Sequence, residues 1–110
     1  MIQHSVMWKF KENQTIDDVK AIKNKLEILP TIIPQIAFYA IGLNIKQADN
    51  AMDMILISKF ESKEDMLTYA AHDEHQKIVK IISESIIESR VVDFEYSFID
   101  IRNIVRNRVM

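Results

Sequence analysis

Two segments of the sequence are apolar on both sides of the strands they are expected to form, and this feature constrains the fold most. Residues 34–45 (PQIAFYAIGLNI) are rich in β-branched and aromatic side chains, and residues 52–60 (MDMILISKF) have the same character through their middle. Side chains alternate between the two faces of a strand. A sheet built on these segments therefore needs a cover on each of its faces.

Two further segments predict strands because apolar side chains recur at every second residue. Residues 90–101 alternate in this way near the end of the chain. Residues 2–11 do so at its start, and their more apolar side consists of Ile2, His4, Val6, Trp8 and Phe10. A histidine within an apolar row marks this first strand as a place to look for a site.

In the segments between these predicted strands, apolar residues recur at helical spacing. Residues 13–30 predict a helix that Thr15 caps, with Asp18 at the capping-box position and Pro30 at its end. Residues 62–89 predict two helices that meet at a bend near residues 72–73, with Ser62 capping the first and Asp73 the second.

The order strand, helix, strand, strand, helix, strand predicts an α+β fold of the ferredoxin-like βαββαβ type. Its four-stranded antiparallel sheet carries the helices on one face and leaves the other face bare. A bare apolar face on a monomer favours association, and a two-fold pair is the commonest arrangement. We therefore expect a homodimer with face-to-face sheets, a dimeric α+β barrel, with Ile55 and Ile57 at the interface.

Composition excludes several classes of function. The 110 residues predict one domain, and the chain has no cysteine and a single glycine, so thiolate sites and Gly-rich phosphate loops are absent. A formal net charge of −2 gives no field for nucleic acid. No apolar run approaches the roughly 20 residues of a membrane span, and the start MIQHSVMWKFK lacks the features of a signal peptide. We expect a cytoplasmic protein with no cofactor, no nucleic-acid partner and no membrane association.

The last residues differ from the body of the chain. Residues 99–110 combine apolar side chains with Arg102, Arg106 and Arg108. We expect a domain over residues 1–98 and a C-terminal extension over residues 99–110 that packs on the body or on the partner subunit.

The stretch YAAHDEHQKIV, residues 69–79, places polar side chains beside the predicted core. His75 shares a helical face with Val79, Ile82 and Ile86, so this face is expected to turn inward. Together with His4 and Tyr69 it predicts one interior pocket, in which the three polar groups bond to one another or to water. The predicted catalytic residues are His75 as base, Tyr69 as hydrogen-bond donor to a carbonyl and His4 as the group that orients them. The predicted substrate-binding residues are Val6, Trp8, Met66, Val79 and Ile82.

A metal site is not predicted. His72 and His75 enclose the string HDEH, which matches neither H-E-x-x-H nor H-x-x-E-H, and the expected bend separates the two imidazoles. We expect His72 to point away from the pocket.

Taken together, the segments MIQHSVMWKFK, LPTIIPQI, FES, YAAHDEHQKIV and VVDFE, in this order and spacing, resemble the stress-responsive α/β-barrel (Dabb) family of small dimeric proteins. The family includes a plant polyketide cyclase that acts without cofactor, and the resemblance implies a pocket between sheet and helices that holds a small apolar carbonyl or polyketide-like molecule. At its motif positions His4, Tyr69 and His75 match the polar set of that cyclase. Two departures are Gln35, where the family usually has glycine, and the longer C-terminal tail.

Three alternatives remain beside cofactor-independent cyclase or lyase chemistry. The histidines and the tyrosine can form a structural brace at the bend. The protein can also be a non-catalytic, stress-related binder of a small molecule. The third alternative is a haem-degrading or quinone monooxygenase of the dimeric barrel type.

Overall fold

The order of the elements is the predicted one, with the second helical region divided into two helices. The structure, a computed structural model, describes residues 1–97. Its elements are β1 (Ile2–Phe10), α1 (Ile16–Ile32), β2 (Phe38–Leu43), β3 (Met54–Phe60), α2 (Lys63–Ala71), α3 (Asp73–Ser85) and β4 (Ile86–Glu95).

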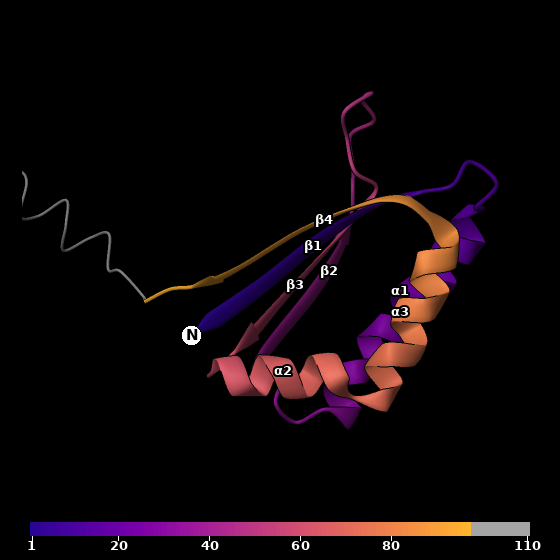
Figure 1. The fold of residues 1–110 in the computed structure, drawn as a ribbon. Coiled ribbons are helices and arrows are strands. Elements are labelled where there is room, and N and C mark those ends of the chain that lie inside the picture. The colour runs from indigo at the N-terminus through magenta and orange to yellow at the C-terminus, as the bar shows by residue number, and fades with distance from the viewer. Residues whose placement is uncertain (98–110) are drawn as a thin grey trace, which may run out of the picture.

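The four strands form one sheet in the order β2-β3-β1-β4, and every neighbouring pair is antiparallel. Figure 1 shows the three helices of residues 1–97 together on one side of this sheet and none of them on the other side. This arrangement confirms the predicted α+β, ferredoxin-like βαββαβ fold.

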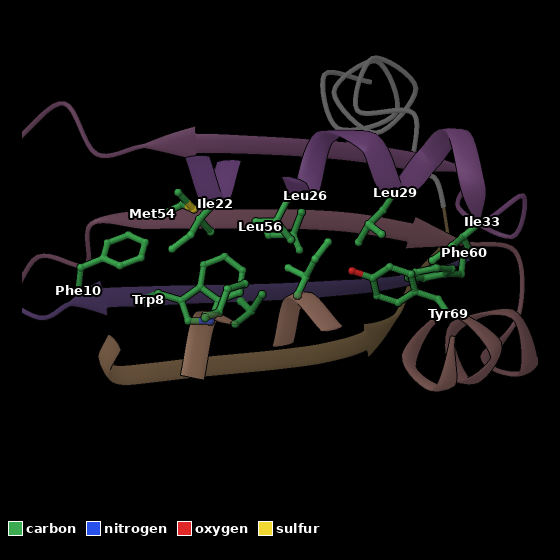
Figure 2. Close-up of a cluster of buried hydrophobic side chains, with 13 residues drawn as sticks. Trp8, Phe10, Ile22, Leu26, Leu29, Ile33, Met54, Leu56, Phe60 and Tyr69 are labelled. Atoms are coloured by element: carbon green, nitrogen blue, oxygen red, sulfur yellow. The ribbon is translucent and has the colours of Figure 1, made fainter. Parts of the chain in front are cut away.

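The core lies between the sheet and the helices. Phe60 and Leu29 are almost completely inaccessible to solvent, and Figure 2 shows the side chains of the sheet and the helices meeting in this layer. The buried apolar residues are Val6, Trp8, Phe10, Ile22, Leu26, Leu29, Ile33, Met54, Leu56, Phe60, Tyr69, Ile78 and Ile82. This layer is the cover that the sequence requires for one face of the sheet.

The opposite side of the sheet, which we call the open face, is also apolar. In β3, Met54 and Leu56 face the helices and are buried, whereas Ile55 and Ile57 alternate with them and are only partly buried. The strand pairing places on the open face Met7, Phe38, Ala40, Ile55, Ile57, Val92 and Phe94. Phe38, Val92 and Phe94 are 46%, 60% and 42% exposed, so the second face has no cover within residues 1–97.

The predicted capping box of α1 is present. The Thr15 hydroxyl accepts a hydrogen bond from the backbone N–H of Asp18, and the Asp18 carboxylate accepts one from the backbone N–H of Thr15. These bonds favour the ionised carboxylate and lower the pKa of Asp18. The predicted end of α1 at Pro30 is wrong, because the helix continues to Ile32. A proline in the last turn removes one backbone hydrogen bond, while the next ones remain: the N–H of Ile33 still donates to the Leu29 carbonyl at 2.8 Å.

The bend between α2 and α3 lies where the sequence places it, but its cap differs. The Ser62 hydroxyl caps α2 by accepting from the N–H of Asp65. The cap of α3 is His72 and not Asp73, because Nδ1 of His72 accepts from the N–H of Glu74 at 3.1 Å. A histidine nitrogen here performs the role that serine or aspartate usually performs.

The predicted extent of the last helix and of the last strand is wrong. The helix ends at Ser85, and β4 begins at Ile86 instead of residue 90. Ile82 and Ile86 continue the helical spacing, but Ile86 pairs with Phe10, and the Ser85 carbonyl accepts from the N–H of Lys11 at 2.9 Å. Pairing with β1 therefore overrides the local pattern.

The predicted C-terminal extension, residues 99–110, lies outside the described residues. Among residues 1–97, no helix combines the length and apolar character that crossing a membrane requires.

Candidate functional site

A cavity of about 220 Å³ lies between the helix-facing side of the sheet and the helices. Strands β1, β3 and β4 form its wall on the sheet side, and helices α1, α2 and α3 form the opposite wall. The lining residues are His4, Val6, Trp8, Leu26, Leu56, Tyr69, His75, Ile78, Val79, Ile82 and Val91. The wall is thus mostly apolar, with three polar side chains at one end, which is the usual composition of a small-molecule site.

The sheet contributes one polar row beneath this end of the cavity. His4 of β1 is opposite Ser58 of β3 and Asp93 of β4, and Ser58 is opposite Tyr39 of β2. The row therefore crosses all four strands on the helix-facing side. The next row, which contains Val6, is entirely apolar, so the polar side chains of the sheet beneath this end of the cavity lie in the row of His4.

Tyr69 lies above this row and is only 2% exposed. Figure 2 shows its side chain reaching from α2 into the core layer. Its hydroxyl is 3.1 Å from the Tyr39 hydroxyl, and its ring is 5.1 Å from the Phe60 ring between centroids. Burial raises the pKa of Tyr69 to about 12, so the hydroxyl stays protonated at neutral pH.

His75 stands next to Tyr69, with the two ring centroids 4.2 Å apart. Its Nδ1 is 3.0 Å from the Ala70 carbonyl oxygen, and because a carbonyl can only accept, Nδ1 carries the hydrogen. The neutral ring then has its lone pair at Nε2. Burial lowers the pKa of His75, and the neighbouring histidines add to this effect, so the ring is neutral near pH 7. The neutral His75 ring can therefore accept a proton, and the protonated Tyr69 hydroxyl beside it can donate a hydrogen bond.

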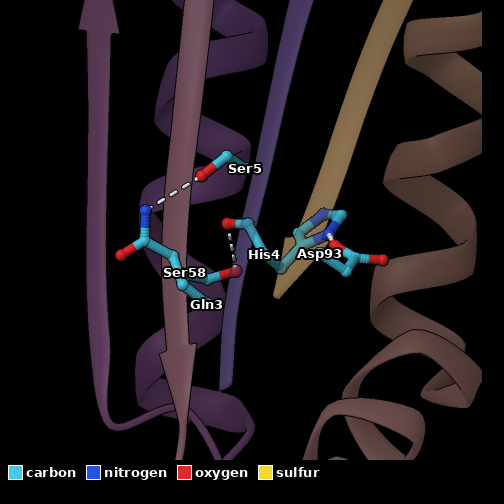
Figure 3. A network of polar contacts seen from close by, with 5 residues as sticks. All are labelled: Gln3, His4, Ser5, Ser58 and Asp93. Atoms are coloured by element: carbon cyan, nitrogen blue, oxygen red, sulfur yellow. Dashed lines mark hydrogen bonds and ion pairs between the residues drawn. The ribbon is translucent and has the colours of Figure 1, made fainter. Parts of the chain in front are cut away.

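His4 is held by a carboxylate. Its Nδ1 is 2.5 Å from Oδ1 of Asp93, across the β1–β4 pair, as Figure 3 shows. The carboxylate accepts from Nδ1, which again leaves Nε2 without a hydrogen in the neutral ring. The His4 ring is 6.5 Å from the Tyr69 ring, so the two side chains belong to the same cluster.

The structure brings most of the predicted site residues together. His4, Tyr69 and His75 all line the cavity, as do the predicted binding residues Val6, Trp8, Val79 and Ile82. Met66 does not line it and packs against the core instead. The three polar residues bond to Asp93, Tyr39 and the Ala70 carbonyl and not to one another, which differs from the prediction.

The inward face of α3 also differs from the predicted stripe. Its buried residues are Ile78, Ile82 and Ser85, whereas Val79 is 41% exposed and reaches the cavity from its rim. Ile86 belongs to β4. His72 is not among the lining residues, as predicted, and serves as the cap of α3.

Sequence reasoning missed Tyr39 and Asp93. Tyr39 belongs to a segment that is apolar on both sides, where a tyrosine has the appearance of core filler. Asp93 alternates with Val92 and Phe94, which is the pattern of an exposed carboxylate. Only the strand pairing places these residues in the row of His4.

The polar groups do not form a metal centre within residues 1–97, where no three metal-binding side chains converge. The arrangement supplies one neutral imidazole, one imidazole held by a carboxylate and one protonated hydroxyl around an apolar space. Such a set can take a proton from an uncharged ligand and donate a hydrogen bond to its oxygen.

Comparisons with known proteins agree with this architecture. A stress-response A/B barrel domain-containing protein of Arabidopsis thaliana is 30% identical over 80 residues, which are 73% of this chain and 30% of that relative. A dimeric ferredoxin-like protein of unknown function from Thermobifida fusca matches with a TM-score of 0.79 at 23% identity over 86% of this chain and 90% of that chain. A hydroxynitrile lyase from Passiflora edulis matches with a TM-score of 0.78 at 16% identity over 88% of this chain and 95% of that chain.

The two structural matches show the fold alone, and the Arabidopsis relative is a longer protein of which this chain spans less than a third. The family profile is more specific. The Stress responsive A/B Barrel Domain (Dabb) profile matches residues 2–96, which include all four strands, all three helices and the cavity. The chain belongs to the stress responsive A/B barrel domain family.

Proposed function

We propose that the cavity binds a small, uncharged, apolar carbonyl compound and that His75 and Tyr69 move protons on it without a cofactor. The observation that carries this proposal is the placement of His75 beside Tyr69 in the wall of an apolar cavity, with Nδ1 of His75 bonded to the Ala70 carbonyl. Nε2 of His75 takes a proton from the carbon next to the carbonyl. The Tyr69 hydroxyl donates to the carbonyl oxygen, on which negative charge develops.

The electrostatics of the wall favour an uncharged ligand. Burial keeps His75 neutral and both tyrosines protonated near pH 7, so none of the three offers a counter-charge. The carboxylate of Asp93 bonds to His4 at the edge of the site. A neutral base beside protonated hydroxyls suits reactions of the cyclase or lyase type that begin with proton transfer. The hydroxynitrile lyase with the same fold supports the second type, since the fold accommodates lyase chemistry in that protein.

The test measures the elementary step itself. Acetophenone in D₂O is incubated with the protein, and loss of its methyl proton signal is followed by NMR. We expect the protein to accelerate exchange of these protons over buffer. Binding of acetophenone without any acceleration would refute catalysis of this step and favour the non-catalytic binder. Haem-dependent oxidation is tested separately, by the visible absorbance of the purified protein.

The rate of this exchange should depend on pH through His75. The folded pKa of His75 lies below the ordinary value of 6.5, so the base is available at neutral pH. We expect a constant rate per protein from neutral pH down to that lowered pKa and then a fall of about tenfold per pH unit. Stability should also decline as the pH falls below 6.5, since the unfolded chain then binds a proton that the folded chain resists. A midpoint of the acid limb above 6.5 would contradict the assignment.

Replacing Tyr69 with phenylalanine tests the donor. The change removes the hydroxyl and keeps the ring that packs on Phe60, so we expect exchange to slow by about 10²–10³-fold, as for loss of an oxyanion donor. The Tyr39 hydroxyl loses its hydrogen-bond partner in this variant, so we expect a modest decrease in melting temperature beside the large loss of rate. A variant that loses stability and keeps its exchange rate would favour a structural role for Tyr69 at the bend between α2 and α3 over a role as hydrogen-bond donor to the ligand.

The proposal includes a homodimer in which two open faces pack against each other. Within residues 1–97 nothing covers the apolar side chains on this face, and the more apolar row of β4, Val92 and Phe94, also turns to it. An adjoining hollow of about 450 Å³, bounded by Met7, Gly42 and Ile55 among others, offers space for side chains of a second copy. The similar protein from Thermobifida fusca is described as dimeric, which supports this arrangement.

A further inference from the structure

Tyr39 belongs to the polar row of the sheet and bonds to Tyr69, but its role does not follow from contact with the cavity. It comes from β2, one of the two edge strands of the sheet, and is not among the residues that line the cavity. Its hydroxyl is 3.1 Å from the Tyr69 hydroxyl, and within residues 1–97 it has no other hydrogen-bond partner. Its ring meets the Tyr69 ring edge-on, with centroids 6.3 Å apart.

The direction of this hydrogen bond decides what Tyr69 can do. Each hydroxyl has one hydrogen to donate, and only one of the two hydrogens can lie between the oxygens. If Tyr69 donated, its one hydrogen would lie between the two oxygens and could not reach a ligand in the cavity. If Tyr39 donates, its own hydrogen is satisfied and the Tyr69 hydrogen is free to reach a ligand in the cavity.

The charges of the pair agree with that direction. Burial raises the pKa of Tyr39, and a negative charge on Tyr69 would raise it further, so the Tyr39 hydroxyl stays protonated and able to donate at neutral pH. The same hydrogen bond acts on Tyr69 in the opposite sense and lowers its pKa against the effect of burial. Tyr39 thus stabilises negative charge on the Tyr69 oxygen, which makes the Tyr69 hydroxyl the better donor.

We propose that Tyr39 is a positioning residue that donates its hydroxyl hydrogen to Tyr69 and thereby commits the Tyr69 hydrogen to the oxygen of a bound ligand. The inference rests on the proposed function, because it concerns the same cavity. Tyr39 acts only through Tyr69 and does not touch the ligand.

Two probes of nearly the same shape test this role. Ionised 4-nitrophenolate imitates the negative charge that develops on the carbonyl oxygen during proton transfer, and its oxygen anion can accept from Tyr69, whereas nitrobenzene lacks that oxygen. Trp8 is the single tryptophan of the chain and lines the cavity, so quenching of its fluorescence reports the binding of either nitroaromatic compound.

We expect Tyr39→Phe to weaken binding of 4-nitrophenolate roughly three- to tenfold, the equivalent of one net hydrogen bond, and to leave nitrobenzene binding unchanged. In the Tyr69→Phe background the same change should have no further effect on either probe. Tyr96→Phe is the matched control, because it removes a tyrosine hydroxyl outside this cluster. Equal losses for both probes, or an equal loss with Tyr69 already replaced, would show a structural role and overturn the inference.

A second measurement does not depend on any ligand. With 3-fluorotyrosine incorporated, the ¹⁹F resonance of residue 69 is titrated with and without Tyr39→Phe. We expect an upward shift of the pKa of residue 69 when Tyr39 is replaced, and an unchanged or lower value would overturn the inference. If neither probe binds to the wild-type protein while this shift is present, the proposed binding function fails and the role of Tyr39 stands.

Discussion

Replacing His75 with glutamine is expected to slow the α-proton exchange of acetophenone by about 10²–10⁴-fold, the usual loss when a general base is removed. The reason is the position of His75 in the cavity wall, with Nδ1 committed to the Ala70 carbonyl and Nε2 left as the base. Glutamine retains a donor for that carbonyl and has no group that takes a proton at neutral pH. The rate is measured by NMR in D₂O under conditions where wild type shows acceleration.

His72→Asn is the matched control for this variant. It removes an imidazole three residues away that does not line the cavity, and asparagine can still cap α3. We expect its exchange rate to remain within about threefold of wild type, since no group of the proposed proton path has changed. A glutamine variant as active as this control would exclude His75 as the base, and His4 would then be the remaining imidazole of the cavity.

Replacing Ile57 with lysine is expected to abolish the dimer. Ile57 lies on an inner strand at the middle of the open face, between Ala40 of β2 and Ser5 of β1. Burying an isoleucine is worth about 1.5–3 kcal/mol, and a two-fold interface contains the residue twice. The loss corresponds to association weakened by about 10²–10⁴-fold or more, because the buried lysine charge adds its own cost. Sedimentation at micromolar concentration should give the mass of one chain, or the variant should be insoluble.

Ile28→Lys serves as the comparison. Ile28 is 53% exposed on α1, on the helical side of the molecule. A lysine there also replaces an isoleucine with a positive charge, but away from the open face. We expect this variant to sediment as a dimer like the wild-type chain. A dimer that persists with Ile57→Lys would show that the chain associates through a surface other than the open face.

Much of the fold follows from local sequence patterns, because the physics they encode is local. Alternation along residues 2–11 determines which side chains of β1 can share a face, and the capping box of Thr15 and Asp18 begins α1 where the sequence places it. The two-sided apolar character of β3 requires two covers, and the structure supplies one of them and leaves Ile55 and Ile57 for the other. Convergence of His4, Tyr69 and His75 also follows from these patterns, given the element order.

Where local and long-range interactions compete, only the tertiary structure decides. The spacing of Ile82 and Ile86 continues a helix, yet pairing of β4 with β1 ends the helix at Ser85. The polar row of Tyr39, Ser58, His4 and Asp93 depends on the registers of three strand pairs, and a shift of one residue in any of them would turn a member to the other face. The sequence by itself determined the fold class and three polar residues that line the cavity. The sheet residues that bond to these side chains were determined by strand register, which no single segment of the sequence encodes.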